Sequence, residues 1–350
     1  MTCGGEATDK QLGDPPDENS TKRHGTMVKI VVKLAVILGM SSLQTSAGAF
    51  SPSINIMALS SSSCDNRHLS TFTELSSSST DSSETIVIGG GRIGSLISAD
   101  DAKLLGRSDN ILTSIDPNGA GPIFIATRND VLSSIVDDCP PSRRKDLVFL
   151  QNGYLDNFLR EKGLLDNTQA LLYLSVPAKD VDPVDGITSV SPDGLTAATG
   201  EHAQAFANRL AKLGLKCNVV TAEEYRPAMF EKLIWIATYM LVGTAKDCIS
   251  VGQAGTEHRQ LVRDVISELT TAVAIKEKIT FARGTIERLE AYTDVVSGFP
   301  CGVKEFEWRN KYFYDLGDSA CPIHNGLLRE CAERNKLGFD LPVIHDIRQN

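Results

Sequence analysis

Three glycines close to residue 90 have the spacing needed to bind a dinucleotide. Gly89, Gly91 and Gly94 follow four β-branched residues, 85–88, and precede a segment compatible with a helix. In such a strand–turn–helix unit, the first glycine permits the tight turn, the second lets a pyrophosphate approach the backbone, and the third lets helix and strand pack closely. The helix N-terminus adds N–H donors and a positive dipole end. The residues expected to bind the dinucleotide are Gly89, Gly91, Arg92, Ile93 and Gly94.

A lysine at the edge of an apolar helix is a second candidate for chemistry. Thr221 and Glu224 have capping-box spacing, which predicts a helix start, and the residues after Lys232 are apolar all round, which indicates burial. Partial burial lowers the pKa of a lysine toward the range that a general acid needs near neutral pH. The residues alone favour the alternative, in which the lysine reaches solvent or pairs with an acid.

Residues 84–221, which contain the glycines, alternate between strand and helix patterns. Such alternation is typical of an α/β domain with a parallel sheet. The expected strands are 85–88, 110–115, 122–127, 146–150, 170–176 and 216–220, with a hairpin made of 187–190 and 195–199. The expected helices run from the glycine turn to about Leu105, over 130–138 and over 201–213.

The end of the second strand bears on the choice between NAD and NADP. If that strand is 110–115, it ends at Asp116, where an acid would bind a ribose hydroxyl and favour NAD. Arg107 offers the opposite interpretation, a partner for a 2′-phosphate, although it lies early for that task. Asp116 fits a turn equally well, so the residues leave both cofactors open.

Residues 222–350, which contain Lys232, are expected to be helical throughout. The expected helices are the one begun by the capping box, then 257–278, 285–293, 304–315 and 324–336. In the second of these the apolar positions recur at a helical period, which indicates a core or dimer contact.

Several blocks of the chain, taken in order, resemble the ketopantoate reductase family. They are the strand with GGGRIG, then IFIATR, VFLQNG, EKLIW and KEFEWRN, and their order matches over residues 85–345. The resemblance implies an α/β N-terminal Rossmann-type dinucleotide-binding domain over 84–221. It also implies a C-terminal all-helical substrate domain over 222–350, with the active site between the two. A monomer or homodimer is expected.

The resemblance implies reduction of a small 2-oxo acid, with 2-dehydropantoate (ketopantoate) to pantoate the named candidate reaction and NADP, or possibly NAD, the cofactor. A hydride from the nicotinamide would reach the carbonyl carbon while Lys232 donates a proton to the oxygen. Asn152 would lie near nicotinamide and substrate, and Glu305 would contact the substrate hydroxyl, with Glu307 its rival. Arg128 stands where the family has a strand-end lysine, and we expect it to bind the cofactor.

The chain also departs from the family pattern. Ile236 and Met240 occupy positions where the family carries asparagines, and the family serine upstream of the glutamate has no clean counterpart, although Ser297 is nearby. Lost hydrogen-bonding groups change which substrate a site selects. Two alternatives therefore stay open: an enzyme of the same fold with another substrate, and a dinucleotide-binding sensor without catalysis.

Composition and charge limit the kinds of molecule that the chain is expected to bind. The 350 residues suffice for two domains, and 41% hydrophobic with 23% charged residues is typical of a soluble globular protein. A net charge of −9 argues against nucleic acid or an anionic membrane as a partner held by bulk charge. The eight cysteines include no C-x-x-C pair, and no cluster has metal-ligand spacing, so we expect no metal and no disulfide framework.

Residues 1–83 have the composition of a targeting presequence. Residues 27–49 combine a basic start, a short apolar run and an A-x-A site, as in a signal peptide. The run is shorter than the roughly 20 residues of a membrane span, so no stable insertion is expected; a buried apolar helix is the alternative. Residues 50–83 are serine-rich, as in a transit peptide. Because the signal-like stretch starts at Met27, that residue is a candidate initiator.

The junction inside this presequence carries its own resemblance. Residues 47–52, Ala-Gly-Ala-Phe-Ser-Pro, resemble the Ala-x-Ala-Phe-x-Pro junction of bipartite presequences in algae with complex plastids. The resemblance implies plastid import, with secretion or the endoplasmic reticulum as the alternative address.

Overall fold

A seven-stranded sheet with strand order β2-β1-β3-β4-β5-β8-β9 organises the N-terminal half of the described chain. The computed structural model describes residues 83–99, 101–178 and 181–342. Every neighbouring pair in this sheet is parallel except β5 with β8. The strands are β1 (Ile86–Ile88), β2 (Lys103–Leu105), β3 (Ile123–Ile125), β4 (Leu147–Phe149), β5 (Gln169–Leu171), β8 (Ala197–Thr199) and β9 (Asn218–Val219).

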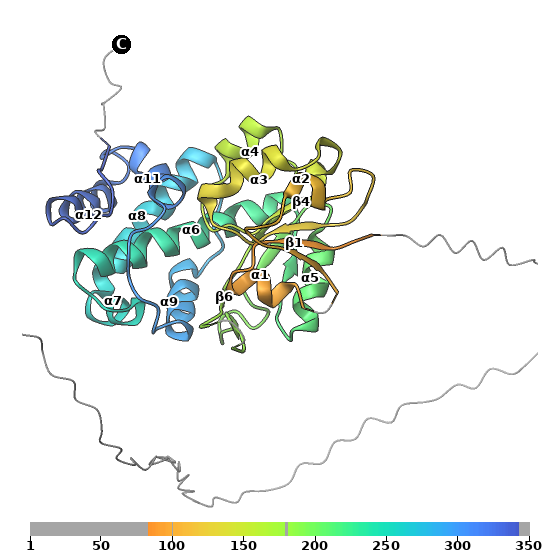
Figure 1. Ribbon diagram of the computed structural model, residues 1–350. Helices are drawn as coiled ribbons and strands as arrows, with labels where there is room; N and C mark the ends of the chain where they lie inside the picture. Colours follow the sequence, from red (N-terminus) through yellow and green to blue (C-terminus); the bar gives the residue numbers. More distant parts are fainter. Residues whose placement is uncertain (1–82, 100, 179–180, 343–350) are drawn as a thin grey trace, which may run out of the picture. The chain divides into compact units, whose positions relative to one another are not determined.

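Helices cover both faces of this sheet (Figure 1). Because successive side chains of a strand point to opposite faces, Ile86 and Ile88 pack against α3 (Leu132–Asp138) and α4 (Asp156–Lys162). Val87, between them, packs on the other face against α1 (Arg92–Ile97) and α5 (Ala203–Lys212). Burial on both faces explains why β1, β3 and β4 consist of apolar residues alone. The α/β fold with a Rossmann-type N-terminal part is confirmed.

Two expectations for residues 98–116 are wrong. The first helix ends at Ile97 and β2 follows, while the segment expected as a strand is the short helix α2 (Ile111–Ser114). The Asn110 side chain accepts a hydrogen bond from the Thr113 N–H at 3.2 Å, so it caps a helix. The strand was missed because β2 is an edge strand with two of its three residues exposed, which leaves no apolar run in the sequence.

Two further corrections concern residues 170–199. The expected strand 170–176 is divided into β5 and β6 (Leu174–Ser175), and β6 pairs with β7 (Val184–Asp185) in a separate two-stranded sheet. The expected hairpin is wrong, since β8 pairs with β5 and residues 187–190 belong to neither sheet. The turn residues Pro192, Asp193 and Gly194 suggested the hairpin, but three of the four residues 187–190 are exposed, in a loop closed by Thr188 and Ser191.

The C-terminal half is built around one long helix, α6 (Ala222–Ala245), which begins with the predicted capping box of Thr221 and Glu224. The other helices are α7 (Val251–Glu257), α8 (Arg259–Glu277), α9 (Thr285–Val295), α10 (Phe306–Arg309), α11 (Lys311–Asp315) and α12 (Pro322–Glu333). The single helix expected over 304–315 is therefore two, separated at Asn310. Between Phe230 and Val242, α6 is buried on nearly all sides, as its apolar sequence predicts.

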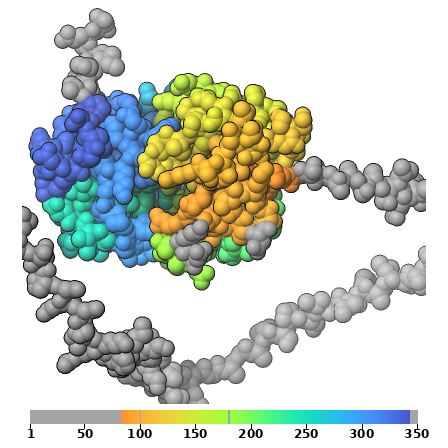
Figure 2. Space-filling view, in the orientation of Figure 1, coloured from red at the N-terminus to blue at the C-terminus, as the bar shows by residue number. Residues whose placement is uncertain are grey.

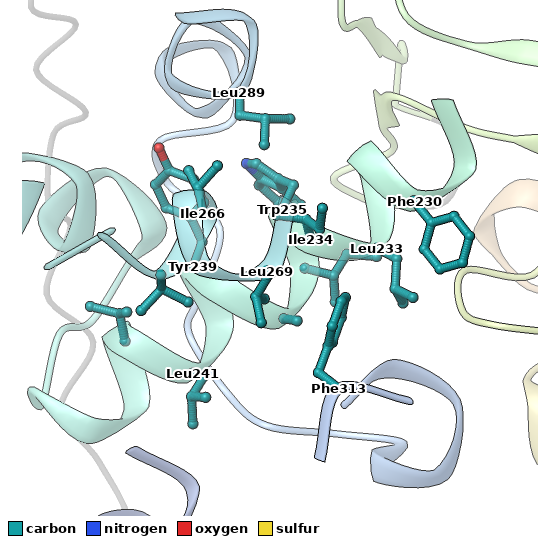
Figure 3. Close-up of a cluster of buried hydrophobic side chains, with 14 of the residues drawn as sticks. Phe230, Leu233, Ile234, Trp235, Tyr239, Leu241, Ile266, Leu269, Leu289 and Phe313 are labelled. Atoms are coloured by element: carbon teal, nitrogen blue, oxygen red, sulfur yellow. The ribbon is translucent and has the colours of Figure 1, made fainter. Parts of the chain in front are cut away.

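The core around α6 draws side chains from several helices (Figure 3). Leu233, Ile234 and Tyr239 of α6 pack with Ile266 and Leu269 of α8, with Leu289 of α9 and with Phe313 of α11. The same cluster includes Leu171, Tyr173 and Ala197 from the sheet half, so the two halves share one apolar core. In the space-filling view the blue helical half packs directly against the orange and yellow sheet half (Figure 2).

The predicted presequence lies outside the described residues, apart from Ser83. Within the described part of the chain, no helix has both the length and the apolar character to cross a membrane.

Candidate active site

The glycine turn after β1 leaves space for a ligand at one position and none at two others. Gly89 has φ +112°, and a Cβ on it would lie 2.8 Å from the carbonyl oxygen of Ala126. A Cβ on Gly94 would lie 1.6 Å from the carbonyl oxygen of Gly89, so α1 packs onto the turn only because residue 94 is glycine. A Cβ on Gly91 would meet nothing within 4 Å. The middle glycine is therefore open, as the approach of a pyrophosphate requires.

The two other predicted residues of this turn have partners in the protein. Arg92 donates from Nη1 to the carbonyl oxygens of Val176 (2.9 Å) and Pro177 (3.2 Å). This ties the turn to the segment that leaves β6. Ile93 is partly buried and packs on the α1 side of the sheet. Both residues shape the turn, and their backbone lies at the start of α1.

The carboxyl ends of β3 and β4 place polar residues beside the glycine turn. The strand order changes direction between β1 and β3, and open α/β sheets bind ligands at such a switch point. Asn129 follows β3 and donates from Nδ2 to the carbonyl oxygen of Asn152, which follows β4, at 3.1 Å. Gln151 donates from Nε2 to the carbonyl oxygen of Ile125 at 2.8 Å. Arg128 is exposed and forms an ion pair with Asp130.

Three buried polar atoms at this edge have no hydrogen-bond partner among the described residues. They are Thr127 Oγ1, Asn129 Oδ1 and Gln151 Oε1. Buried polar atoms are rarely left unpaired, so each calls for a partner that the protein does not supply. Together with the open Gly91, these atoms fit a dinucleotide whose polar end reaches the ends of β3 and β4.

The residue that follows the second strand is Arg107 and not Asp116. Gly106 and Asp109 close a turn, with the Asp109 carboxylate accepting from the Gly106 N–H at 2.7 Å, and Arg107 is exposed within it. Asp116 lies in a different turn, where its carboxylate accepts from the Asn118 N–H at 2.9 Å. Arg107 lies before the strand that was expected at 110–115, but after the observed strand β2, which begins seven residues earlier, at Lys103.

Lys232 and Asn152 come from opposite halves of the protein and line the same cavity of about 10 Å³. That volume holds about one water molecule. Lys232 is only 5% exposed, and its Nζ donates to the Tyr292 hydroxyl at 3.3 Å. Burial, with a smaller contribution from the Arg309 charge, holds the pKa of Lys232 well below its usual range. The sequence prediction of a buried lysine at a polar edge matches this position.

Glu305 connects the helical half to the strand ends. Its Oε1 accepts from the backbone N–H of Asn129 at 3.4 Å, and its other oxygen pairs with Arg309. Glu305 has φ +51°, an uncommon conformation for a residue with a side chain, and it caps the start of α10. Its rival Glu307 is exposed and lines a separate groove beside Trp308. The geometry brings Glu305, and not Glu307, to Asn129 and Asn152.

The backbone of α10 docks against the loop after β4. The Tyr154 N–H donates to the Trp308 carbonyl oxygen at 2.7 Å. Gly153 has φ +144°, and a Cβ on it would lie 2.8 Å from that same oxygen. A glycine after Asn152 is thus what allows α10, which begins next to Glu305, to pack against this loop.

Solved structures with a similar fold exist, although no protein-family model and no curated protein sequence matches the chain. A ketopantoate reductase of the PanE/ApbA family from Ralstonia eutropha JMP134 matches with a TM-score of 0.51 and 18% identity, over 71% of this chain and 99% of its own. The 2-dehydropantoate 2-reductase from Methylococcus capsulatus matches with a TM-score of 0.53 and 13% identity, over 74% and 99%. D-mandelate dehydrogenase, solved with NADH, matches with a TM-score of 0.51 and 16% identity, over 73% and 100%.

The chain has the ketopantoate reductase fold. In this fold its departures from the family pattern lie inside the apolar core. Ile236 is buried in the cluster around α6, and Met240 packs at its margin. Ser297 is exposed and lies against Gly252 of α7, so it does not face Lys232. Thr293, one turn before it, is buried and accepts from Trp235 Nε1 at 2.8 Å.

The ketopantoate reductase fold also brings to the site residues that the sequence did not single out. Asn129 and Arg309 take part in the contacts of Glu305 and Asn152, and Gln151 joins the ends of β4 and β3. Tyr173, Trp235 and Tyr292 surround Lys232. A signal existed for Asn129 and Gln151, which stand directly after apolar strands. None existed for the aromatic residues, because the burial of an aromatic side chain is expected in any core and does not by itself indicate a functional contact.

Proposed function

We propose that the chain reduces a small 2-oxo acid with NAD(P)H, and that 2-dehydropantoate is the substrate and pantoate the product. The observation that carries the proposal is the meeting of Lys232 and Asn152 at one cavity, with Glu305 joined to Asn152 through Asn129. A proton donor, an amide and a carboxylate thus come together at the ligand edge of a dinucleotide-binding sheet. The two ketopantoate reductases that share the fold support the choice of substrate.

In this reaction the bound nicotinamide supplies a hydride. Lys232, in its ammonium form, donates a proton from Nζ to the carbonyl oxygen as negative charge develops there. Asn152 orients the carbonyl group, and Glu305 accepts a hydrogen bond from a substrate hydroxyl. Exclusion of water from the small cavity strengthens each of these polar interactions.

We further propose NADP as the preferred cofactor, with NAD possible. Arg107 follows β2 at the position where an arginine accommodates a 2′-phosphate, and it forms no ion pair with any described residue. Arg128, at the end of β3, is a second exposed cation at the same edge, although it is paired with Asp130. Gly89, Gly91 and Gly94 would hold the pyrophosphate.

The proposed location is the plastid, to which the signal-like and transit-like segments within residues 1–83 would direct the protein. The proposed assembly is a monomer or homodimer. A ketopantoate reductase from Staphylococcus aureus that shares the fold, with a TM-score of 0.52 and 16% identity, is dimeric. Import of residues 1–83 fused to a fluorescent protein into a complex plastid tests the first point, and sedimentation of the purified chain tests the second.

The deciding experiment follows nicotinamide absorbance with the purified protein, NADPH and ketopantoate, beside NADH and a set of other 2-oxo acids. Turnover of ketopantoate supports the reaction, substrate and cofactor together. Clear cofactor binding without turnover of any acid contradicts the catalytic proposal and leaves the sensor alternative.

A second candidate is an enzyme of the same fold with a less polar substrate. Ile236 and Met240 favour it, because apolar side chains in the core and at its margin stand where the family pattern has two hydrogen-bonding groups, one and two turns beyond Lys232. D-mandelate dehydrogenase shows that this fold also occurs in an enzyme named for an aromatic 2-hydroxy acid. Faster turnover of benzoylformate than of ketopantoate would support this candidate over the first.

A further inference from the structure

Three aromatic rings surround the ammonium group of Lys232. Its Nζ lies 4.1 Å from the ring centroid of Tyr173, 4.5 Å from that of Tyr292 and 4.6 Å from that of Trp235. All three rings are almost completely buried. Tyr173 belongs to the sheet half, between β5 and β6, whereas Trp235 is on α6 and Tyr292 is on α9. The cage, defined as Tyr173, Trp235 and Tyr292, is therefore assembled from both halves of the protein.

The rings of the cage are held by one another and by hydrogen bonds. Tyr292 makes edge contacts with Tyr173 (centroids 4.7 Å apart) and with Trp235 (4.9 Å). Trp235 donates from Nε1 to Thr293 Oγ1 at 2.8 Å, and Thr293 in turn donates to the Leu289 carbonyl oxygen at 2.8 Å. Figure 3 shows Trp235 beside Leu289 of α9. The ring positions are thus fixed independently of the lysine.

No carboxylate among the described residues pairs with Lys232. Glu231, next to it on α6, is bound by Arg288 of α9 at 2.7 Å. Asp156, which lines the same cavity, is paired with Arg226, and Glu305 is paired with Arg309. The other titratable groups around the lysine are Tyr292, Tyr173 and, across the cavity, Tyr225. The charge of Arg309 on α10 also acts on Lys232 and lowers its pKa.

Burial without a carboxylate favours a neutral amine, whereas a proton donor must be an ammonium ion. Ring faces attract a cation through their quadrupole, and the attraction is strongest where water is excluded. The cage therefore stabilises the ammonium form of Lys232 in place of a carboxylate. It does so without the fixed negative charge that would repel an anionic 2-oxo acid.

We propose that Tyr173, Trp235 and Tyr292 are positioning residues that hold Lys232 against the cavity and keep it in the ammonium form. The inference rests on the proposed function, because it explains how a fully buried lysine can donate a proton. The Tyr292 hydroxyl adds one acceptor, and the open side of the cage is the cavity that Lys232 shares with Asn152. Since Tyr173 comes from the sheet half, the protonation of Lys232 depends on contact between the two halves.

The test measures the titration of Lys232 itself in the full-length protein. Its Cε resonance is followed by NMR in protein with ¹³C-labelled lysine and is assigned by its loss in Lys232→Met. Tyr292→Leu removes a ring and lowers the Lys232 pKa by about one unit. Tyr292→Phe keeps the ring and produces a smaller decrease. Phe313→Leu removes an equally buried ring, on α11, whose ring contacts are Tyr312 and His324 and not the cage, and it leaves the titration unchanged.

Fluorinated tryptophan tests the cage without changing its shape. The chain has two tryptophans, so in Trp308→Phe the label enters only at Trp235. Each added fluorine weakens the ring quadrupole, and we expect the Lys232 pKa to fall in steps. The matched control is Trp235→Phe, in which the label enters only at Trp308 and the step is absent. The fluorinated Trp235 protein keeps all three rings of the cage at full size, so it is informative even if Tyr292→Leu does not fold.

An unchanged or raised Lys232 pKa in the fluorinated Trp235 protein would overturn the inference. The titration needs no substrate, so its outcome is independent of whether any 2-oxo acid is turned over. Where turnover is found, the alkaline limb of the kcat profile shifts to lower pH by the same amount as the measured pKa. A loss of kcat with no shift of that limb indicates a merely structural role and also contradicts the inference.

Discussion

The glycine turn after β1 and the surroundings of Lys232 on α6 contribute to one candidate site through different parts of the chain. At the turn the surface is formed by the backbone, because all three key residues are glycines. A side chain at Gly89 or Gly94 would clash with the protein, and one at Gly91 would fill the open space. At Lys232 the surface is made of side chains, and they come from β5–β6, α6 and α9. The first surface depends on residues at most five positions apart in the sequence, and the second on residues more than a hundred positions apart.

This difference has a consequence for substitution. A change in the turn alters cofactor binding and local packing together, because the same backbone does both. A change at Lys232 alters proton transfer and leaves the cofactor surface intact. Substitutions in the two regions can therefore be told apart by what they change.

Replacing Lys232 with alanine tests the helical half. We expect kcat for 2-oxo acid reduction to fall by about 10²- to 10⁴-fold, the usual contribution of a general acid. Binding of NADPH, measured by fluorescence titration, should be unchanged because the glycine turn lies in the sheet half. Lys246→Ala is the matched control, since Lys246 ends the same helix and pairs with Glu330 near the surface. Full activity in Lys232→Ala would remove the proton donor from the proposal.

The same lysine gives a pH dependence with a definite sign. Reduction requires the ammonium form, so kcat should fall as pH rises through the pKa of Lys232. Because burial lowers this pKa, the loss occurs well below pH 10.5, the ordinary value for lysine. A pH–rate profile of kcat with saturating substrate measures it. A rate that stays constant up to the ordinary lysine range would contradict the assignment.

Gly94→Ala and Gly91→Ala test the sheet half against each other. The alanine Cβ at residue 94 would overlap the Gly89 carbonyl oxygen, and we expect the free energy of unfolding to decrease by about 3 kcal/mol. At residue 91 the Cβ meets no protein atom, so stability should change by no more than about 0.5 kcal/mol. Cofactor affinity should fall in both. Urea unfolding and NADPH titration measure the pair, and unimpaired binding in Gly91→Ala would show that the pyrophosphate lies elsewhere.

Glu305→Gln and Glu307→Gln compare two acids two residues apart. The first removes the charge that faces Asn129 and Arg309, and kcat/KM should fall by about 10- to 100-fold, the equivalent of a charged hydrogen bond. The second changes an exposed acid and should leave kcat/KM within twofold of wild type. An equal decrease of kcat/KM in both variants would mean that Glu305 makes no specific contact with the substrate.

Arg107→Ala has the smallest expected effect. If Arg107 binds the 2′-phosphate, the variant should bind NADPH about fivefold more weakly, the size of an exposed ion pair, and NADH unchanged. Asp116→Ala is the control and should alter neither cofactor, because Asp116 lies in a turn away from β2. A stronger effect of Asp116→Ala on NADH would restore the discarded assignment.

The sequence predicted the cofactor edge of the sheet well where the chain is buried on both faces. The strands that became β1, β3 and β4 are continuous apolar runs. β1 ends in the glycine turn, and β3 and β4 lead into the polar residues that meet at the switch point. The prediction failed at β2, whose residues are mostly exposed, and at 187–190, whose β-branched residues lie in a loop. Edge strands and loops are decided by neighbours that are distant in the chain, so a local pattern does not identify them.

By itself the sequence determined the glycine turn, the capping box and burial of α6, and the order of the blocks that resemble ketopantoate reductases. Each of these depends on residues within one or two turns, where sterics and hydrogen bonding act locally. Only the tertiary structure decided that Arg107 follows the second strand, that Glu305 and not Glu307 meets Asn129, and that three rings enclose Lys232. Those outcomes depend on how the halves pack, and contacts between distant segments leave no periodic trace in a single sequence.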